Sequence, residues 1–372
     1  MKKIAVFSFF GYNYGTVLQL YALYSIIKRS GNDADYIEFI GHFSSWRVKL
    51  GRIKRDILGL FRSQKGKDLD SQEYWNSYAF RKIKKKIDTF VESEMSYQQV
   101  VFSEMESLNE RYDIFLVGSD QIWSVRGLNE NSPALLGFVK DCKKKASYAP
   151  SFGTTQLDDS FIGLLKRNIA DFHYLSCRER SNALKLASAL SRSVFCALDP
   201  TLLLNNEEWA TVSSKYKMPK KYILCYILGE KECISEYAEN LGERSSLPVY
   251  YILTRPFYKG KKNLLTDVGP REFIDLINNC SCLVTDSFHG IIFSINFSKP
   301  FYAFNKREGA NTGDNDRIKE ILKEFNLNDR FVEDGDKGKD DGIDPIEYKD
   351  IQAHLTLLRK DSMQYLDKIL NI

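Results

Sequence analysis

Short apolar runs alternate with segments of helical periodicity through the first half of the chain. The first run, residues 3–9, is followed by a loop with two glycines, and apolar side chains then recur at helical spacing until Gly31 ends the pattern. The periodic positions are Val17, Leu20, Tyr24 and Ile27. Later runs with the length and composition of strands cover residues 36–40, 112–117, 146–152, 172–177 and 194–198. This alternation predicts a mainly parallel sheet covered on both faces.

The pattern restarts after a polar stretch at residues 205–220. The second half predicts strands at 222–228, 249–253, 282–285 and 301–304, and helices at 233–241, 271–277, 290–297, 316–325 and 346–370. We therefore expect an α/β protein with two Rossmann-like doubly wound domains, residues 1–204 and 221–372, joined by a linker at about 205–220. Two such domains face each other across a cleft, and ligands bind in that cleft.

Composition agrees with this organisation. The 372 residues are 43% hydrophobic and 27% charged, which excludes disordered and fibrous classes, and the length suggests two domains. The net charge of +4, from 53 basic and 49 acidic residues, gives no argument for a nucleic-acid partner. The N-terminal apolar run is short and lacks a cleavage site, and no segment reaches the length of a membrane span, so we expect a cytoplasmic protein. Seven cysteines without a CxxC pair are expected to be buried thiols rather than zinc ligands.

Two segments interrupt the alternation. A basic helical insertion is expected at about 44–90, where residues 46–67 place Ile53, Ile57 and Leu60 at helical spacing among many lysines and arginines. This pattern fits contact with a membrane surface or a polyanionic acceptor, or a solvated helix packed on the first domain, which is the commoner case. The basic run at 81–86 adds to that surface. The polar stretch at 333–344 predicts a loop and lacks the spacing of an EF-hand.

The sharpest candidate for chemistry is the end of the strand at 282–285. A turn with Asp286 and Ser287 follows it, and a helix begins near His289. A helix N-terminus favours an anion, and histidine is the side chain best suited to move protons near neutral pH. The alternative is that Ser287 or Asp286 caps the helix and that His289 forms a hydrogen bond within the core. The local spacing favours neither interpretation.

Three further segments place polar groups where strands end. The side chains of Arg178 and Arg180 project to the same side of the strand end and can bind carboxylate or phosphate oxygens. The alternative is that each forms an ion pair at the protein surface. The loop at 10–16 lacks nucleotide-binding fingerprints. Its Tyr12, Asn13 and Tyr14 can contact a sugar, and Gly15 allows close approach of a ligand, although ordinary turn chemistry explains the loop equally well. In the third segment, Asp120 can accept a proton from a hydroxyl, or can cap a helix.

Seven segments together resemble the polysaccharide pyruvyl transferase family and occur in the family's order. They are GYNYGTVLQ (11–19), VGSDQIW (117–123), YAPSFG (148–153), SCRERS (176–181), LDPTL (198–202), GPREF (269–273) and TDSFHG (285–290). The resemblance implies a fold like that of the GT-B glycosyltransferases, with the acceptor on the first domain and the donor on the second. It also implies transfer of pyruvate from phosphoenolpyruvate to two hydroxyls of a sugar in a surface or capsular polysaccharide, as a cyclic ketal, with release of phosphate.

The sequence departs from the family at one position of the histidine motif. Family members commonly carry Arg-Leu-His where this chain has Ser287-Phe288-His289. An anion contact of that arginine must then come from other residues, or the donor is handled differently. The candidate donor-binding residues are Arg178, Arg180, Ser287, Lys306, Arg307 and Arg317.

A catalytic hypothesis follows from the chemistry of ketal formation. The vinyl carbon of phosphoenolpyruvate must be protonated, and two acceptor hydroxyls must lose their protons. We assign the proton transfer to His289 and the orientation or deprotonation of the acceptor to Asp120. Acceptor-binding residues are expected at Tyr12, Asn13, Tyr14 and Gly15. No cofactor is expected beyond the donor substrate, no metal ligands stand out, and a divalent cation would arrive with the phosphate.

Two other classes of protein fit the same architecture. A sugar-nucleotide glycosyltransferase would bind a diphosphate at a helix N-terminus of the second domain. A non-catalytic glycan-binding relative would bind acceptor without consuming a donor. The sequence identifies neither the acceptor sugar nor the oligomeric state. A lipid-linked oligosaccharide acceptor would give the basic insertion a role at the inner face of the membrane.

Overall fold

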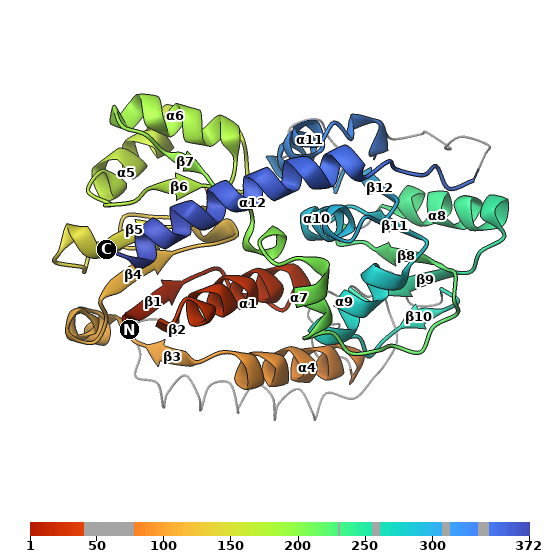
Figure 1. Cartoon of the computed structure of the whole chain (residues 1–372), viewed down its shortest axis with the longest axis horizontal. Helices are drawn as coiled ribbons and strands as arrows, with labels where there is room; N and C mark the ends of the chain where they lie inside the picture. Colours follow the sequence, from red (N-terminus) through yellow and green to blue (C-terminus); the bar gives the residue numbers. More distant parts are fainter. Residues whose placement is uncertain (41–77, 230, 255–260, 307–312, 334–341) are drawn as a thin grey trace, which may run out of the picture.

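The computed structural model describes residues 1–40, 78–229, 231–254, 261–306, 313–333 and 342–372. Within this part of the chain, two parallel β-sheets lie side by side, each with helices packed against it (Figure 1). The predicted α/β class with two doubly wound units is confirmed. The amphipathic helix expected at 46–67 lies outside the described residues.

The first sheet has the strand order β3-β2-β1-β4-β5 and all of its strand pairs are parallel. Its strands are β1 (Lys3–Phe7), β2 (Asp33–Phe39), β3 (Tyr97–Val100), β4 (Ile114–Val117) and β5 (Lys145–Ser147). Helices α1 (Tyr14–Arg29) and α4 (Tyr78–Glu94) belong to the same unit. Successive side chains of β1 point to opposite faces, so Ile4 and Val6 enter one apolar cluster and Ala5 and Phe7 enter another.

A small layer extends the first unit beyond β5. Strands β6 (Ser176–Cys177) and β7 (Phe195–Cys196) pair in parallel, and α5 (Asp159–Ile169) and α6 (Arg180–Leu190) cover them. The linker segment predicted at 205–220 contains a short helix, α7 (Asn206–Ala210). Its Trp209 is fully buried against Tyr21 of α1 and Phe293 of the second unit, so the segment is packed between the two units.

The second sheet has the order β10-β9-β8-β11-β12-β13 and is also parallel throughout. Its strands are β8 (Ile223–Tyr226), β9 (Val249–Ile252), β10 (Leu264–Leu265), β11 (Cys282–Thr285), β12 (Phe301–Phe304) and β13 (Phe331–Val332). The helices of this unit are α8 (Glu232–Ser245), α9 (Pro270–Asn279), α10 (Phe288–Asn296) and α11 (Gly313–Glu324).

Each sheet has one place where the order of its strands reverses. In the first sheet this place lies between β1 and β4, and in the second it lies between β8 and β11. The loops that leave the carboxyl ends of two such strands diverge to opposite faces and leave a crevice, which is where open α/β sheets bind ligands. The two reversal points therefore predict which four loops build the site.

The two units share an apolar core. Tyr14 of α1 stacks on Phe273 of α9, with ring centroids 4.7 Å apart, and its hydroxyl donates a hydrogen bond to the carbonyl of Val268 at 3.0 Å. One buried cluster contains side chains of both units, including Leu18 and Ile291. Burial of this apolar surface holds the first helix of the chain against the second unit.

The closing helix, α12 (Lys349–Leu370), returns from the second unit to the first (Figure 1). Tyr365 stacks on Phe195 of β7, with centroids 4.4 Å apart, and donates to the carbonyl of Ser147 at 3.2 Å. At the end of the chain, the carbonyl of Ile372 accepts a hydrogen bond from the Lys2 ammonium. Residues 221–372 are thus not confined to one side of the cleft.

Several predicted elements differ in extent from those observed. The strand expected at 146–152 ends at Ser147, because Ala149 (φ +51°) turns the backbone out of the extended region. The strand expected at 172–177 is reduced to β6. The predicted insertion at 44–90 contains the start of α4, and β3 follows it as a polar edge strand, Tyr-Gln-Gln-Val, without an apolar run to reveal it.

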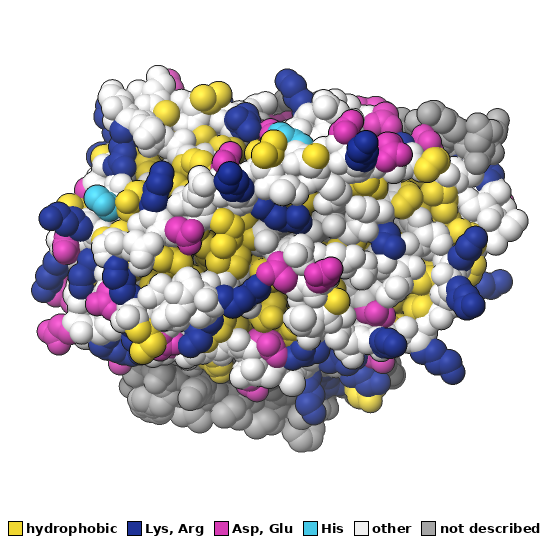
Figure 2. All heavy atoms as spheres, in the orientation of Figure 1, with side chains coloured by type: hydrophobic (Ala, Val, Ile, Leu, Met, Phe, Trp, Pro, Cys, Tyr) yellow, Lys and Arg dark blue, Asp and Glu magenta, His cyan; other side chains and the backbone are white. Residues whose placement is uncertain are grey.

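Lysine, arginine, aspartate and glutamate side chains are interspersed over the face shown in Figure 2, as the small net charge leads one to expect. None of the described helices has the length and apolar character needed to cross a membrane.

Candidate active site

The four loops at the two reversal points meet around a pocket of about 350 Å³. The loop after β1 contributes Tyr12 and Asn13, the loop after β4 contributes Asp120, and the loop after β8 contributes Leu228. The segment after β11 supplies Asp286, Ser287, Phe288 and His289. The pocket lies between the two units, where the cleft was predicted.

Two helices begin at this pocket. Asn13 caps α1, its side chain accepting from the backbone N–H of Gly15 at 2.9 Å, and Ser287 caps α10, its hydroxyl accepting from Gly290 at 3.4 Å. Both capping residues line the pocket, so the positive ends of both helix dipoles face it. Lys306 and Arg317 also line it. This combination suits a ligand with more than one negative charge.

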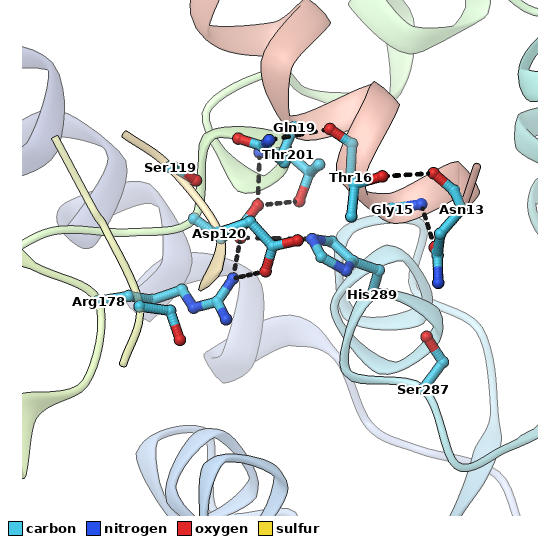
Figure 3. A network of polar contacts seen from close by, with 12 residues as sticks. Asn13, Gly15, Thr16, Gln19, Ser119, Asp120, Arg178, Thr201, Ser287 and His289 are labelled. Atoms are coloured by element: carbon cyan, nitrogen blue, oxygen red, sulfur yellow. Dashed lines mark hydrogen bonds and ion pairs between the residues drawn. The ribbon is translucent and has the colours of Figure 1, made fainter. Parts of the chain in front are cut away.

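His289 projects from the first turn of α10 into the wall between the pocket and the first unit (Figure 3). Its Nε2 lies 3.5 Å from Oδ2 of Asp199, and the same oxygen accepts from Nη1 of Arg178 at 2.7 Å. The three side chains are each at least nine-tenths buried. The guanidinium, the carboxylate and the imidazole follow one another in a row, and of the three only the imidazole lines this pocket.

Asp199 is fixed from its other side by Thr201. The backbone N–H and the hydroxyl of Thr201 donate to Oδ1 of Asp199 at 3.0 and 2.8 Å. Burial opposes ionisation of this carboxyl, but His289, Arg178 and Thr201 outweigh burial and hold the pKa of Asp199 well below its ordinary value. Asp199 is therefore a permanent anion at neutral pH.

Asp120 reaches the pocket from an unusual backbone conformation. It follows β4 with φ +59° and ψ −162°, a region that costs a non-glycine residue about 1–3 kcal/mol. The backbone N–H of Ser151 donates to its carbonyl at 2.7 Å, and its carboxylate lies 3.4 Å from Nη1 of Arg178. These contacts hold the side chain against the pocket wall, within the reach of a ligand hydroxyl.

Asp286 bridges the ends of β8 and β11. Its two oxygens accept from the backbone N–H groups of Leu228 and Gly229, each at 2.6 Å. Burial raises the pKa of the Asp286 carboxyl to about 6, although these hydrogen bonds and Lys306 oppose the rise. The pocket thus contains a carboxyl that changes charge close to physiological pH.

Only some of the residues predicted to bind the donor line the pocket. Ser287, Lys306 and Arg317 line the pocket, while Arg178 lies behind His289 and Asp199. Arg180 is largely exposed, pairs with Glu324 of α11 at 3.2 Å, and lines a separate cavity of about 380 Å³. Arg307 is outside the described residues.

Phe288 separates the two cavities. The guanidinium carbon of Arg178 lies 4.3 Å from the centre of its ring, and that of Arg317 lies 5.9 Å away. All three side chains line the second cavity, and Phe288 and Arg317 line the first as well. Cations pack on an aromatic face at these distances.

The residues predicted to bind the acceptor also fall into two groups. Tyr12, Asn13 and Tyr14 all line the pocket, but the ring of Tyr14 is buried by its stack on Phe273. Gly15 does not line the pocket but lies against His289, since a β-carbon at Gly15 would come within 2.2 Å of Nδ1. Together with the predicted Tyr12, Phe9 and Phe80 form an aromatic rim at the pocket, and these two were not predicted. Phe80 comes from α4, whose polar and basic surface hid it in the sequence.

Asp199 was also missed by sequence reasoning as a site residue. It belongs to the LDPTL segment, where Asp before Pro reads as a helix cap, and it does cap the short helix η5 (Pro200–Leu202). No local signal reveals that its second oxygen faces a histidine from the other unit. Among the described residues, no group of three His, Cys, Asp or Glu side chains is arranged to hold a metal ion.

Comparisons with known proteins agree with this architecture. A family model described as polysaccharide pyruvyl transferase matches residues 13–306. Arabidopsis thaliana UGT89C1 complexed with UDP is similar in structure, with a TM-score of 0.52, 10% sequence identity, and coverage of 100% of this chain and 99% of that chain. The same protein complexed with quercetin gives a TM-score of 0.50 at 10% identity, covering 100% and 98%. These likenesses show the GT-B fold and nothing finer. A search of curated proteins finds no match.

Proposed function

Because the chain belongs to the polysaccharide pyruvyl transferase family, a family of transferases, we propose that it transfers pyruvate from phosphoenolpyruvate to a sugar. The product is a ketal that bridges two hydroxyls of a polysaccharide precursor, and phosphate is released. The observation that carries this proposal is the convergence of two helix N-termini, Lys306 and Arg317 on the pocket that His289 enters. Phosphoenolpyruvate has both a carboxylate and a phosphate, and it requires several such groups.

Arg317 is the best candidate to supply the anion contact for which family members commonly use an arginine at the position of Ser287. It lines the pocket and packs on Phe288, the neighbour of Ser287. Lys306 lines the same wall, and the Ser287 hydroxyl stays at the cap of α10. The donor anions would then lie between α10 and α11, next to the imidazole.

His289 acts as the proton donor in this proposal. The protonated imidazole transfers a proton to the methylene carbon of phosphoenolpyruvate, which becomes the methyl group of the product. The neighbouring carbon becomes electron-deficient, and the first acceptor hydroxyl adds to it and loses its proton. The second hydroxyl then replaces the phosphate, which leaves with the shared electron pair. One hydroxyl proton restores His289, and the other leaves with the phosphate or with solvent, so protons and charge balance.

Asp120 serves the acceptor. Its carboxylate lines the pocket and is held next to Arg178, so it can accept a hydrogen bond from the attacking hydroxyl and orient it. The rim formed by Phe9, Tyr12 and Phe80 offers apolar faces on which a sugar ring can pack. In this proposal the acceptor binds to the first unit and the donor binds to the second.

A thermal-shift titration with phosphoenolpyruvate, and in parallel with a panel of nucleotide sugars, tests the proposal without knowledge of the acceptor. A ligand that binds only the folded protein stabilises it, by about 2.7 kcal/mol at a hundredfold excess over Kd. We expect stabilisation by phosphoenolpyruvate that is lost in Arg317→Gln and kept in Arg180→Gln, whose side chain lies outside the pocket.

The other outcomes of this titration are equally informative. Stabilisation by a nucleotide sugar alone would replace the proposal with glycosyl transfer, a reaction for which the GT-B fold is also suited. Loss of the phosphoenolpyruvate effect in Arg180→Gln rather than Arg317→Gln would move the donor to the second cavity. No response to any donor would favour a non-catalytic, glycan-binding protein.

A further inference from the structure

We propose that Asp199 is a positioning residue that fixes which ring nitrogen of His289 faces the substrate pocket. In this arrangement Nε2 is directed at Asp199 and Nδ1 is the nitrogen that exchanges protons with the substrate. The proposal rests on the proposed function for the use made of that proton. The orientation of the ring does not depend on it and can be measured separately.

Asp199 is well placed to act as a rigid anchor. It caps η5, whose first residue is Pro200, and the pyrrolidine ring restricts the backbone on that side. The carboxylate has only 1% of its side-chain surface exposed. Oδ1 is occupied by two hydrogen bonds from Thr201, which leaves Oδ2 for His289 and Arg178. Rotation of the carboxylate would break all of these contacts together.

The imidazole is confined on its other side by α1. A β-carbon at Gly15 would lie 2.2 Å from Nδ1 and 2.3 Å from Cγ of His289, so the backbone of α1 lies directly against the ring. A ring turned by 180° would direct Cε1 rather than Nε2 at Asp199 and would lose the contact of 3.5 Å between Nε2 and Oδ2. The carboxylate of Asp199 and the backbone at Gly15 together select one ring orientation.

This orientation determines where the proton is carried. In the neutral ring the hydrogen is on Nε2 and is directed at Asp199, so Nδ1 holds a lone pair. Protonation places the second hydrogen on Nδ1, and that hydrogen is the one delivered to the donor. Regeneration returns a proton to the same nitrogen. Asp199 itself remains an anion throughout, as expected from its depressed pKa.

The ring is surrounded by charges of both signs, and Asp199 is the anion nearest to it. The other charged side chains around the same wall and pocket are Arg178, Asp120, Arg317, Lys306 and Asp286. Arg178 shares Oδ2 with His289 and opposes a positive charge on the ring. Removal of the negative charge of Asp199 therefore disfavours a positive charge on the His289 ring in two ways. An attractive charge is lost, and the guanidinium of Arg178 is no longer neutralised.

Nitrogen-15 NMR of histidine-labelled protein tests this proposal. The chain has four histidines, and His289→Gln identifies the signals of His289. In the natural protein at high pH, we expect the hydrogen of the neutral ring almost entirely on Nε2. In Asp199→Asn, we expect a mixture of the two tautomers, because the carboxylate that faces Nε2 is lost. Asp35→Asn is the control, since that carboxyl is also buried but lies on β2.

Each outcome decides the proposal. A neutral ring with its hydrogen on Nδ1 in the natural protein would overturn it, and so would an unchanged tautomer in Asp199→Asn. If Asp199→Asn does not fold, the tautomer in the natural protein decides alone. A correct tautomer in a protein that no phosphoenolpyruvate stabilises would reject the proposed function while leaving the role of Asp199 intact.

Discussion

Gly15 and His289 are in direct contact across the two units, since a β-carbon at Gly15 would lie 2.2 Å from Nδ1 of the imidazole. The first turn of α1 therefore forms part of the wall that holds the catalytic histidine of our proposal. The glycine is needed for close approach and not for its backbone conformation, because it is in a regular helix. This contact couples the position of the imidazole to the packing of the two units.

Gly15→Ala tests this contact. The added methyl group must displace either the imidazole or α1, and such overpacking costs about 1–3 kcal/mol of the free energy of unfolding. We expect lower stability in urea and loss of the response to phosphoenolpyruvate. Gly163→Ala is the matched control, because that helical glycine has only the end of the Arg167 side chain within 4 Å. The control should gain about 0.5–1 kcal/mol, and equal behaviour of the two variants would contradict the interpretation.

Tyr14→Phe separates packing from ligand binding. The change removes the hydrogen bond from the Tyr14 hydroxyl to the carbonyl of Val268 and leaves the stack on Phe273. We expect a loss of about 0.5–1.5 kcal/mol in the free energy of unfolding, measured in urea. The thermal shift produced by phosphoenolpyruvate should be unchanged. A changed shift would indicate that the Tyr14 hydroxyl contacts the donor, whereas the sequence suggested a contact with the acceptor.

Asp286 should leave a distinct signature in the pH dependence of stability. Its folded-state pKa, about 6, lies above the ordinary value of 3.8, so the folded protein binds the proton first as pH falls. This carboxyl therefore adds stability as pH falls from about 7 to about 4, by about 3 kcal/mol in total. Asp199 has the opposite sign, because its depressed pKa gives stability above about pH 4 that is lost in more acidic solution.

The measurement for Asp286 is urea unfolding at a series of pH values. The difference in free energy of unfolding between the natural protein and Asp286→Asn should change with pH between 7 and 4 and be constant above 7. A difference that is the same at every pH would show that Asp286 does not titrate in this range.

Ser287→Arg restores the arginine that family members commonly carry before the histidine. Ser287 lines the pocket, so the added guanidinium would face the donor anions. We expect roughly tenfold tighter binding of phosphoenolpyruvate, since a charge-assisted hydrogen bond contributes about 1.5–3 kcal/mol before the cost of ordering the side chain. Stability should fall by about 1 kcal/mol, because the helix cap is lost.

Ser287→Ala is the control for that substitution. It removes the same cap and adds no charge, so it should show the loss of stability without tighter binding. Equal phosphoenolpyruvate affinities in Ser287→Arg and Ser287→Ala would mean that the donor anions lie elsewhere.

The strand-to-helix segment at His289 was largely predictable from the sequence. An apolar strand that ends at Thr285 and a helix that begins at Phe288 are local patterns, and Ser287 at the cap follows from the preference of serine for that position. The sequence left open whether this segment caps the helix or contributes to a ligand site, and the structure shows features of both. Ser287 does cap α10, and His289 nevertheless lines the pocket.

Contacts between the units were not predictable in the same way. The pairing of His289 with Asp199 and the contact with Gly15 join residues that are distant in sequence, and no periodicity encodes them. The edge strand β3 was missed because its polar residues give no apolar run. Arg178 and Arg180 look equivalent in the sequence, but one enters the buried chain of charges and the other pairs with Glu324 at the surface.

The return of α12 to the first unit has a consequence for how the protein is made. Phe195, Tyr174 and Ser147 of the first unit are covered by Tyr365, which the ribosome adds long after them. Domains generally fold as units from the N-terminus during synthesis. Here the first unit emerges early, but the packing of Phe195 and Tyr174 is completed only after α12 has been released.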